Sequence, residues 1–208
     1  IELMISLTIG LFMLAGLTTL FVNQSRARAD LDRANRLVEN GRYAMEVLSE
    51  DVRLAGFYGE LDPSSLALPA AMPDPCSTAA LDIVSALRLH VQGYDNITTV
   101  SMPGCVESGD IQPGTDVLIV RRSETNLSPA PAAATTAPYL QVSLCQYDAA
   151  GYRLDTTGFT LRQKDCTSTG AGSLTQVRRF LVHVYFVSPC NVYASSQTTC
   201  TSAADGGS

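Results

Sequence analysis

Side chains that could carry catalysis or bind a metal ion are few in this sequence of 208 residues and stand apart from one another. His90 and His183 lie in segments with strand-like alternation, and neither has a histidine, cysteine or carboxylate at the spacing of a metal site. Gly170-Ala171-Gly172 lacks the third glycine of a dinucleotide loop, and no Gly-x-Ser-x-Gly motif occurs. We therefore expect no catalytic residue, no metal site, no cofactor and no small-molecule substrate.

The cysteines indicate disulfide bonds rather than metal binding. Their number is six, which is even, and no Cys-x-x-Cys spacing occurs, so an oxidising compartment outside the cytoplasm is favoured. Six cysteines allow fifteen pairings, and spacing alone does not choose among them. Our hypothesis is that nearest neighbours pair: Cys76-Cys105, Cys145-Cys166 and Cys190-Cys200.

Composition excludes further classes. The chain has a net charge of −6 and a single lysine, which leaves no large basic patch for direct binding of nucleic acid. Its hydrophobic fraction of 46% excludes a disordered chain, and its charged fraction of 16% is low. The apolar residues must therefore be concentrated somewhere along the chain.

They are concentrated in residues 1–22, where Glu2 is the only ionisable side chain. An apolar run of this length spans roughly 33 Å as a helix, enough to cross a bilayer. The run is too long for a signal peptide and lacks a basic start, so we interpret it as a transmembrane helix. A carboxylate in such a helix is costly unless a cation pairs with it, and a free α-amino group on a neighbouring copy is one such cation.

The helix is predicted to continue without a break through residues 23–55, where charged residues cancel. Apolar and small residues alternate spacings of four and three, which is the pattern of an amphipathic packing seam. Gly56 is the expected C-cap, and Pro63 prevents the helix from resuming. The residues of this seam are Ala27, Leu31, Ala34, Val38, Gly41, Met45, Leu48, Val52 and Ala55.

Residues 56–208 are predicted to form a β-rich head. Short alternating segments indicate a mainly antiparallel sheet, and Asp148 and Asp155 flank a glycine turn, where we expect them to be solvated. Packing of the seam on one face of the sheet would give an α+β fold. The predicted strands are Ala86 to Gln92, Asp116 to Arg122, Tyr139 to Gln146, Gly158 to Gln163 and Val177 to Val187.

Two stretches of the sequence resemble a known family. Ile1-Glu2-Leu3-Met4-Ile5-Ser6-Leu7-Thr8-Ile9-Gly10 is similar to the start of a type IV pilin helix just after its leader-peptide cleavage site. Residues 39–59, from Glu39-Asn40-Gly41-Arg42 to Ala55-Gly56-Phe57-Tyr58-Gly59, are similar to the helix end of PilW-like minor pilins. Weaker similarity occurs in residues 114–122 and 179–187.

The resemblance implies a pilin-like fold and a structural minor pilin of a type IV pilus. Glu2 would then pair with the N-terminal amine of another subunit, and the chain would join a tip or priming complex with other minor pilins, the major pilin and a PilY-type tip adhesin. The resemblance also implies residence in the inner membrane, head in the periplasm, before assembly, and an extracellular pilus afterwards. The leader and the methylated first residue are absent, so we expect a segment to be missing before Ile1. PilW-like proteins usually continue with more sheet, so we also expect a C-terminal part to be missing after Ser208. The family's helix proline is absent as well.

Two other functions fit the same residues. A type II secretion pseudopilin has the same kind of helix and belongs to a different machine. A membrane-anchored periplasmic binding or sensor protein needs the anchor without the ability to leave the membrane.

Overall fold

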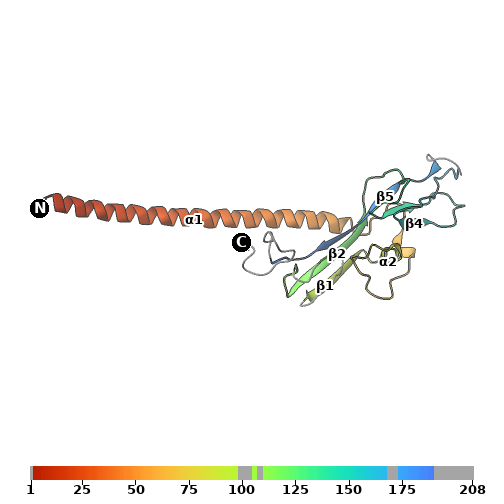
Figure 1. The fold of residues 1–208 in the computed structure, drawn as a ribbon, viewed down its shortest axis with the longest axis horizontal. Helices are drawn as coiled ribbons and strands as arrows, with labels where there is room; N and C mark the ends of the chain where they lie inside the picture. Colours follow the sequence, from red (N-terminus) through yellow and green to blue (C-terminus); the bar gives the residue numbers. More distant parts are fainter. Residues whose placement is uncertain (1, 98–104, 107–109, 168–172, 190–208) are drawn as a thin grey trace. The chain divides into compact units, whose positions relative to one another are not determined.

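The computed structural model describes residues 2–97, 105–106, 110–167 and 173–189. They form two compact units, residues 1–50 and 51–208, which we describe separately. The first unit consists of α1 up to Glu50, and the second consists of the last turn of that helix and the head (Figure 1).

The helix α1 comprises Glu2–Arg53, which is 52 residues without a proline. Hydroxyl groups in its apolar part are satisfied inside the helix: Ser6 donates to the carbonyl of Glu2 at 2.8 Å, and Thr8 donates to that of Met4 at 3.0 Å. Polar side chains bonded in this way are tolerated in lipid. By its length and composition α1 is able to cross a membrane.

The helix ends at Arg53, two residues before the predicted Ala55, and a turn leads to Gly56. Gly56 has φ +76°, a conformation that residues with a β-carbon adopt at a cost, and its N–H donates to the carbonyl of Arg121 at 3.0 Å. A β-carbon there would lie 2.8 Å from the ring of His90. The helix therefore ends before the predicted cap, and Gly56 lies in the turn that brings the chain against the sheet.

The head contains one antiparallel sheet with the strand order β1-β2-β5-β3-β4. In Figure 1, β2 and β5 run side by side, as their six paired residues require. The α+β class expected from the sequence is therefore confirmed. The remaining elements are η1 (Pro63–Ser65), α2 (Ala80–Ser85), β1 (Val91–Ile97), β2 (Thr115–Ser123), β3 (Tyr139–Val142), β4 (Tyr152–Asp155) and β5 (Val177–Tyr185).

Two hydrophobic clusters hold the head together. One gathers Tyr58, whose ring stacks on Phe180 of β5 at 6.0 Å, with Leu87 and with residues of α2, β3 and β4. The other packs Val117 and Ile119 of β2 against Ile97 at the end of β1 and against Val106 and Ile111, which lie between β1 and β2. The core thus lies against the adjacent strands β2 and β5, with β1 beside β2 and with β3 and β4 on the other side of β5.

The predicted strand Ala86 to Gln92 is wrong. Its first residues follow the short helix α2, and β1 begins only at Val91. The predicted burial is also reversed at the strand start, because Val91 is 41% exposed and Gln92 is buried. The polar side chain of Gln92 is stable in the interior because its amide is hydrogen-bonded: it donates to the carbonyl of Pro73 and accepts from Arg121.

The second half of the sheet also differs from expectation. Gly158 to Gln163 forms no strand apart from one bridge at Arg162, and the predicted Tyr139 to Gln146 ends as a strand at Val142. The strand β4 lies where the sequence predicts a glycine turn between Asp148 and Asp155. Alternation near residue 160 instead reflects the burial of Phe159 and Leu161 in an irregular segment.

Disulfide bonds join Cys76 to Cys105 and Cys145 to Cys166, with Cα atoms 5.4 and 5.1 Å apart. Both are pairs of nearest neighbours along the chain. The third hypothesised pair, Cys190-Cys200, lies outside the described residues.

Candidate functional site

The apolar part of α1 presents large side chains to its surroundings. Leu3 is 80% exposed, Phe12 is 81% exposed and Phe21 is 74% exposed. A continuous apolar surface of this size on a helix is stable only in lipid or among similar helices. This surface is the first candidate functional feature of the chain.

Glu2 lies in the first turn of α1, where the helix dipole favours a negative charge. It is exposed and makes no ion pair with any residue that the structure describes. Its carboxylate is therefore available to a cation on another molecule. The predicted pairing with an N-terminal amine stays a prediction.

The seam residues of the first unit are also exposed in the single chain. Leu31 and Val38 are each 63% exposed, and Met45 is 65% exposed, while Ala27, Ala34 and Gly41 are likewise exposed. Leu48 and Ala55 are half-buried, and Val52 is 44% exposed. The packing of this seam on a sheet stays a prediction.

The sheet of the head is hydrogen-bonded to the last turn of α1 through one buried carboxylate. Asp51 accepts hydrogen bonds from Arg122 Nε at 2.5 Å, His183 Nδ1 at 2.7 Å and Tyr185 Oη at 2.9 Å. Its side chain is 4% exposed, and it is the one buried residue of α1. Arg122 comes from β2, and His183 and Tyr185 come from β5, so a single side chain bonds both central strands. We call these four residues the Asp51 cluster.

The electrostatics of the cluster favour the ionised carboxylate. Burial alone would raise the pKa of Asp51, but the hydrogen bonds from Arg122, His183 and Tyr185 hold that pKa below its ordinary value. Burial and the neighbouring Asp51 carboxylate raise the pKa of Tyr185 to about 12. The cluster is therefore an ionised aspartate held by a guanidinium, an imidazole and a neutral phenol.

Sequence reasoning missed this cluster, since it counted Asp51 among helix charges that cancel and found no carboxylate at metal-site spacing near His183. A signal was present in the position of Asp51. A negative charge in the last turn of a helix is disfavoured by the helix dipole, which suggests that another element of the fold stabilises it. The identity of its partners depends on the pairing of β2 with β5, which local sequence does not reveal.

A second buried polar group lies on the opposite face of β2. Arg121 is 2% exposed and donates to the carbonyl of Leu89 at 3.0 Å and to Gln92 Oε1 at 2.7 Å, and Gln92 donates to Tyr94 Oη at 2.7 Å. Burial lowers the pKa of Arg121. These bonds tie β1 to β2 and have the character of a structural network.

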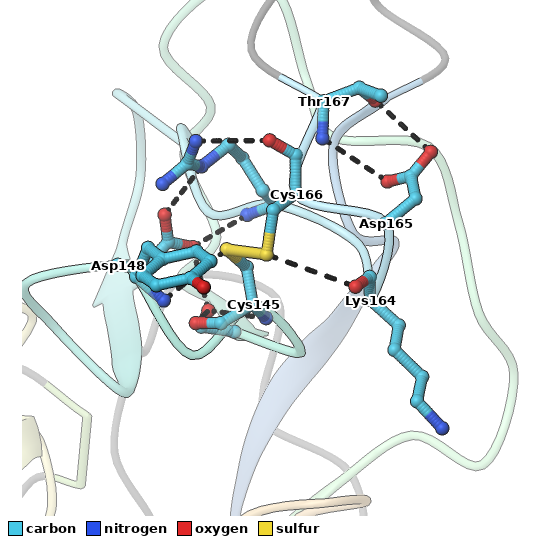
Figure 2. The surroundings of a disulfide bond; sticks show 9 residues. Cys145, Asp148, Lys164, Asp165, Cys166 and Thr167 are labelled. Carbon is cyan, nitrogen blue, oxygen red and sulfur yellow. Dashed lines mark hydrogen bonds and ion pairs between the residues drawn. A yellow bond between two sulfur atoms is a disulfide. The ribbon is translucent and has the colours of Figure 1, made fainter.

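The Cys145-Cys166 disulfide lies beside Asp148 (Figure 2). Asp148 accepts from the hydroxyl of Ser143 and from both the backbone N–H and the Nε of Arg162, and its side chain is only 8% exposed. The prediction of a solvated Asp148 is therefore wrong, because a non-local arginine covers it. The hydrogen bond from Ser143 and those from Arg162 lower the pKa of Asp148 to about 2.

Among the described residues, few ionisable side chains lie together where they could catalyse a reaction or bind a metal ion. A cavity of about 270 Å³ between β3 and the segment before β5 has Glu60 as its only ionisable lining residue. No group of three histidine, cysteine or acidic residues suited to a metal ion occurs among the described residues. Gly170-Ala171-Gly172 lies outside them.

Comparison with known proteins assigns no relative. No protein-family model matches this chain, and neither a curated protein nor a solved structure matches it significantly.

Proposed function

We propose that this chain is a structural minor pilin of a type IV pilus, built into the filament through α1. The observation that carries the proposal is the apolar half of α1, which is exposed throughout and has Glu2 as its lone carboxylate. A helix of this kind suits two environments, lipid and a bundle of similar helices. The disulfide-bonded head at its other end suits an oxidising exterior.

The exchange between these environments is physically reasonable. Lipid chains and neighbouring apolar helices are similarly apolar, so moving the helix from one to the other leaves its burial nearly unchanged. Glu2 then supplies direction and register, because a carboxylate in apolar surroundings requires a cation. In the proposed mechanism that cation is the N-terminal amine of another subunit, which selects one axial position.

The proposal includes partners and location. The chain would wait in the inner membrane with its head in the periplasm and would then enter a tip or priming complex. Other minor pilins, the major pilin and a PilY-type tip adhesin are its proposed partners. In the filament, the apolar half of α1 would pack among similar helices and the head would contact neighbouring heads.

The test compares Glu2→Val with the matched control Glu46→Val, which replaces another exposed glutamate of α1. Cells producing each full chain are sheared, and the subunit is quantified in the filament and membrane fractions. A hydrogen bond to a charged group contributes about 1.5 to 3 kcal/mol, so Glu2→Val should reduce incorporation roughly tenfold or more. The control should leave incorporation unchanged.

Other distributions would contradict the proposal. Retention of the wild-type chain wholly in the membrane would support a membrane-anchored binding or sensor protein. Association with a secretion machine and independence from pili would support a type II secretion pseudopilin. Equal incorporation of Glu2→Val and wild type would refute the role of Glu2.

A further inference from the structure

Among the residues that the structure describes, Arg121 carries a buried positive charge that no carboxylate neutralises. Its guanidinium donates to uncharged oxygens, the carbonyl of Leu89 at 3.0 Å and Gln92 Oε1 at 2.7 Å. By contrast, Arg122 and Arg178 lie 2.5 and 3.7 Å from a carboxylate. An arginine stays charged in a protein interior, and buried charges are ordinarily paired. The charge of Arg121 therefore requires an anion.

Three polar atoms in the neighbourhood of Arg121 are buried without a hydrogen-bond partner among the described residues. They are Tyr58 Oη, Ser123 Oγ and His90 Nδ1. Tyr58 is 1% exposed and Ser123 is 0% exposed. Unpaired buried polar atoms are rare in folded proteins, and a bound ion or water is one of the explanations for them.

These atoms belong to residues that surround one stretch of β2. Arg121 and Ser123 are two residues apart on that strand and therefore share a face. The backbone N–H of Arg121 donates to the carbonyl of His90 at 2.8 Å. The ring of Tyr58 lies 6.2 Å from that of His90 and 6.0 Å from that of Phe180, which pairs with Ser123. The phenol of Tyr58 also interacts electrostatically with the guanidinium of Arg121. We call Arg121, Tyr58, Ser123 and His90 the Arg121 site.

The Arg121 site is rich in hydrogen-bond donors. The bonds to Leu89 and Gln92 use two of the guanidinium N–H groups and leave others free to donate. Burial raises the pKa of Tyr58, so its phenol stays protonated and able to donate. The hydroxyl of Ser123 is a further donor. Donors grouped around a positive charge favour an anion over a cation.

Burial restricts the size of that anion. Arg121 is 2% exposed, and Tyr58 and Ser123 are covered even more completely. A side chain of another protein or a polyatomic anion such as phosphate cannot reach groups so enclosed, whereas a monatomic ion can enter through local opening of the head.

We propose that the Arg121 site binds one monatomic inorganic anion, chloride in the native environment, between the guanidinium of Arg121 and the hydroxyls of Tyr58 and Ser123. The bound ion neutralises the buried charge and stabilises the head. A water molecule could bond the same hydroxyls, but it would leave the charge of Arg121 unneutralised. The two ligands therefore differ in whether stability depends on chloride. The site lies within the head and does not depend on the proposed function.

The first test is the stability of the full chain in detergent as a function of chloride concentration. Sodium gluconate, whose anion is too large for the site, is replaced by sodium chloride at constant ionic strength, which keeps the screening of surface charges unchanged. An ion that binds only the folded state raises the equilibrium constant for folding in proportion to its concentration above Kd. We therefore expect an increase of about tenfold for each tenfold rise in chloride. An equilibrium constant independent of chloride would overturn the proposal and indicate water at the site.

The second test removes single groups from the site. Tyr58→Phe deletes one donor and keeps the ring, and it should weaken chloride binding about tenfold or more. Tyr152→Phe is the matched control, because Tyr152 is half-buried against the same hydrophobic cluster, and it should leave chloride binding unchanged. Ser123→Ala should act like Tyr58→Phe, and Arg121→Met should abolish the dependence on chloride. Equal dependence on chloride in the wild type and in both hydroxyl variants would contradict the proposal.

A third measurement locates the ion directly. Bromide replaces chloride in such sites and scatters X-rays anomalously. Crystals of the full chain grown in bromide should show an anomalous peak within hydrogen-bond distance of Arg121 and Tyr58 Oη. Anomalous peaks confined to exposed side chains would refute an anion at the Arg121 site.

Discussion

Replacement of Asp51 by alanine tests whether the Asp51 cluster holds the helix end on the sheet. The change removes the acceptor for three hydrogen bonds of 2.5 to 2.9 Å and leaves the guanidinium of Arg122, itself only 17% exposed, without its carboxylate. Removing one partner of a buried ion pair costs about 3 to 5 kcal/mol. Because His183 is 39% exposed and regains water, we expect about 3 kcal/mol, the lower end of that range.

The local effect of Asp51→Ala on the helix is opposite in sign to the loss of the Asp51 cluster, so the measured change in stability distinguishes the two. Alanine has higher helix propensity than aspartate, and removing a negative charge from the last turn of a helix relieves about 0.3 to 1 kcal/mol of unfavourable dipole interaction. Without the cluster, Asp51→Ala should therefore stabilise the protein. Glu50→Ala, at the exposed neighbouring position, reports these local effects alone and should be neutral or slightly stabilising.

The assay is thermal unfolding of the full chain in detergent, followed by the circular dichroism of the head. For a unit of this size 1 kcal/mol corresponds to roughly 2 to 4 °C, so Asp51→Ala should lower Tm by about 6 to 12 °C. Carbon-13 tyrosine spectra should also show the pKa of Tyr185 falling from about 12 toward its ordinary value. A Tm equal to that of Glu50→Ala would refute the reasoning.

Three further outcomes follow from the head. Gly56→Ala should destabilise it by about 1 to 2 kcal/mol, since φ is +76°, whereas Gly41→Ala in open helix surface should stabilise α1 slightly, as measured by denaturant titration. Replacing Cys145 and Cys166 together by serine should cost about 3 kcal/mol in the same titration, because the bond closes a loop of 21 residues. Because its pKa is depressed, Asp148 contributes stability that is complete above about pH 4 and is lost as pH falls toward 2. Asp148→Asn should therefore be less stable at neutral pH, and its free energy of unfolding should fall less steeply between about pH 4 and pH 2. An equally steep fall in the variant and the wild type would contradict this.

The local sequence pattern was sufficient to predict those features that depend on one segment of the chain. The long helix and its end near Gly56 follow from an unbroken periodic run and a residue able to adopt positive φ. The pairing of neighbouring cysteines also agrees with the two described disulfides, because both bonds close short loops. The bounds of β1 and β4 were missed, since hydrogen bonding buried Gln92 and an irregular segment imitated strand alternation near Phe159.

The amino-acid sequence by itself determined an apolar helix with one carboxylate, an amphipathic continuation and an acidic β-rich head. Each of these depends on composition and short-range periodicity, which the chain carries whatever its fold. Tertiary structure alone decided that Asp51 is buried, that Asp148 is covered by Arg162, and that β3 pairs with β5 only from Val177 to Arg179. These features depend on which strands become neighbours, and neighbours far apart in sequence are chosen by the packing of the whole head.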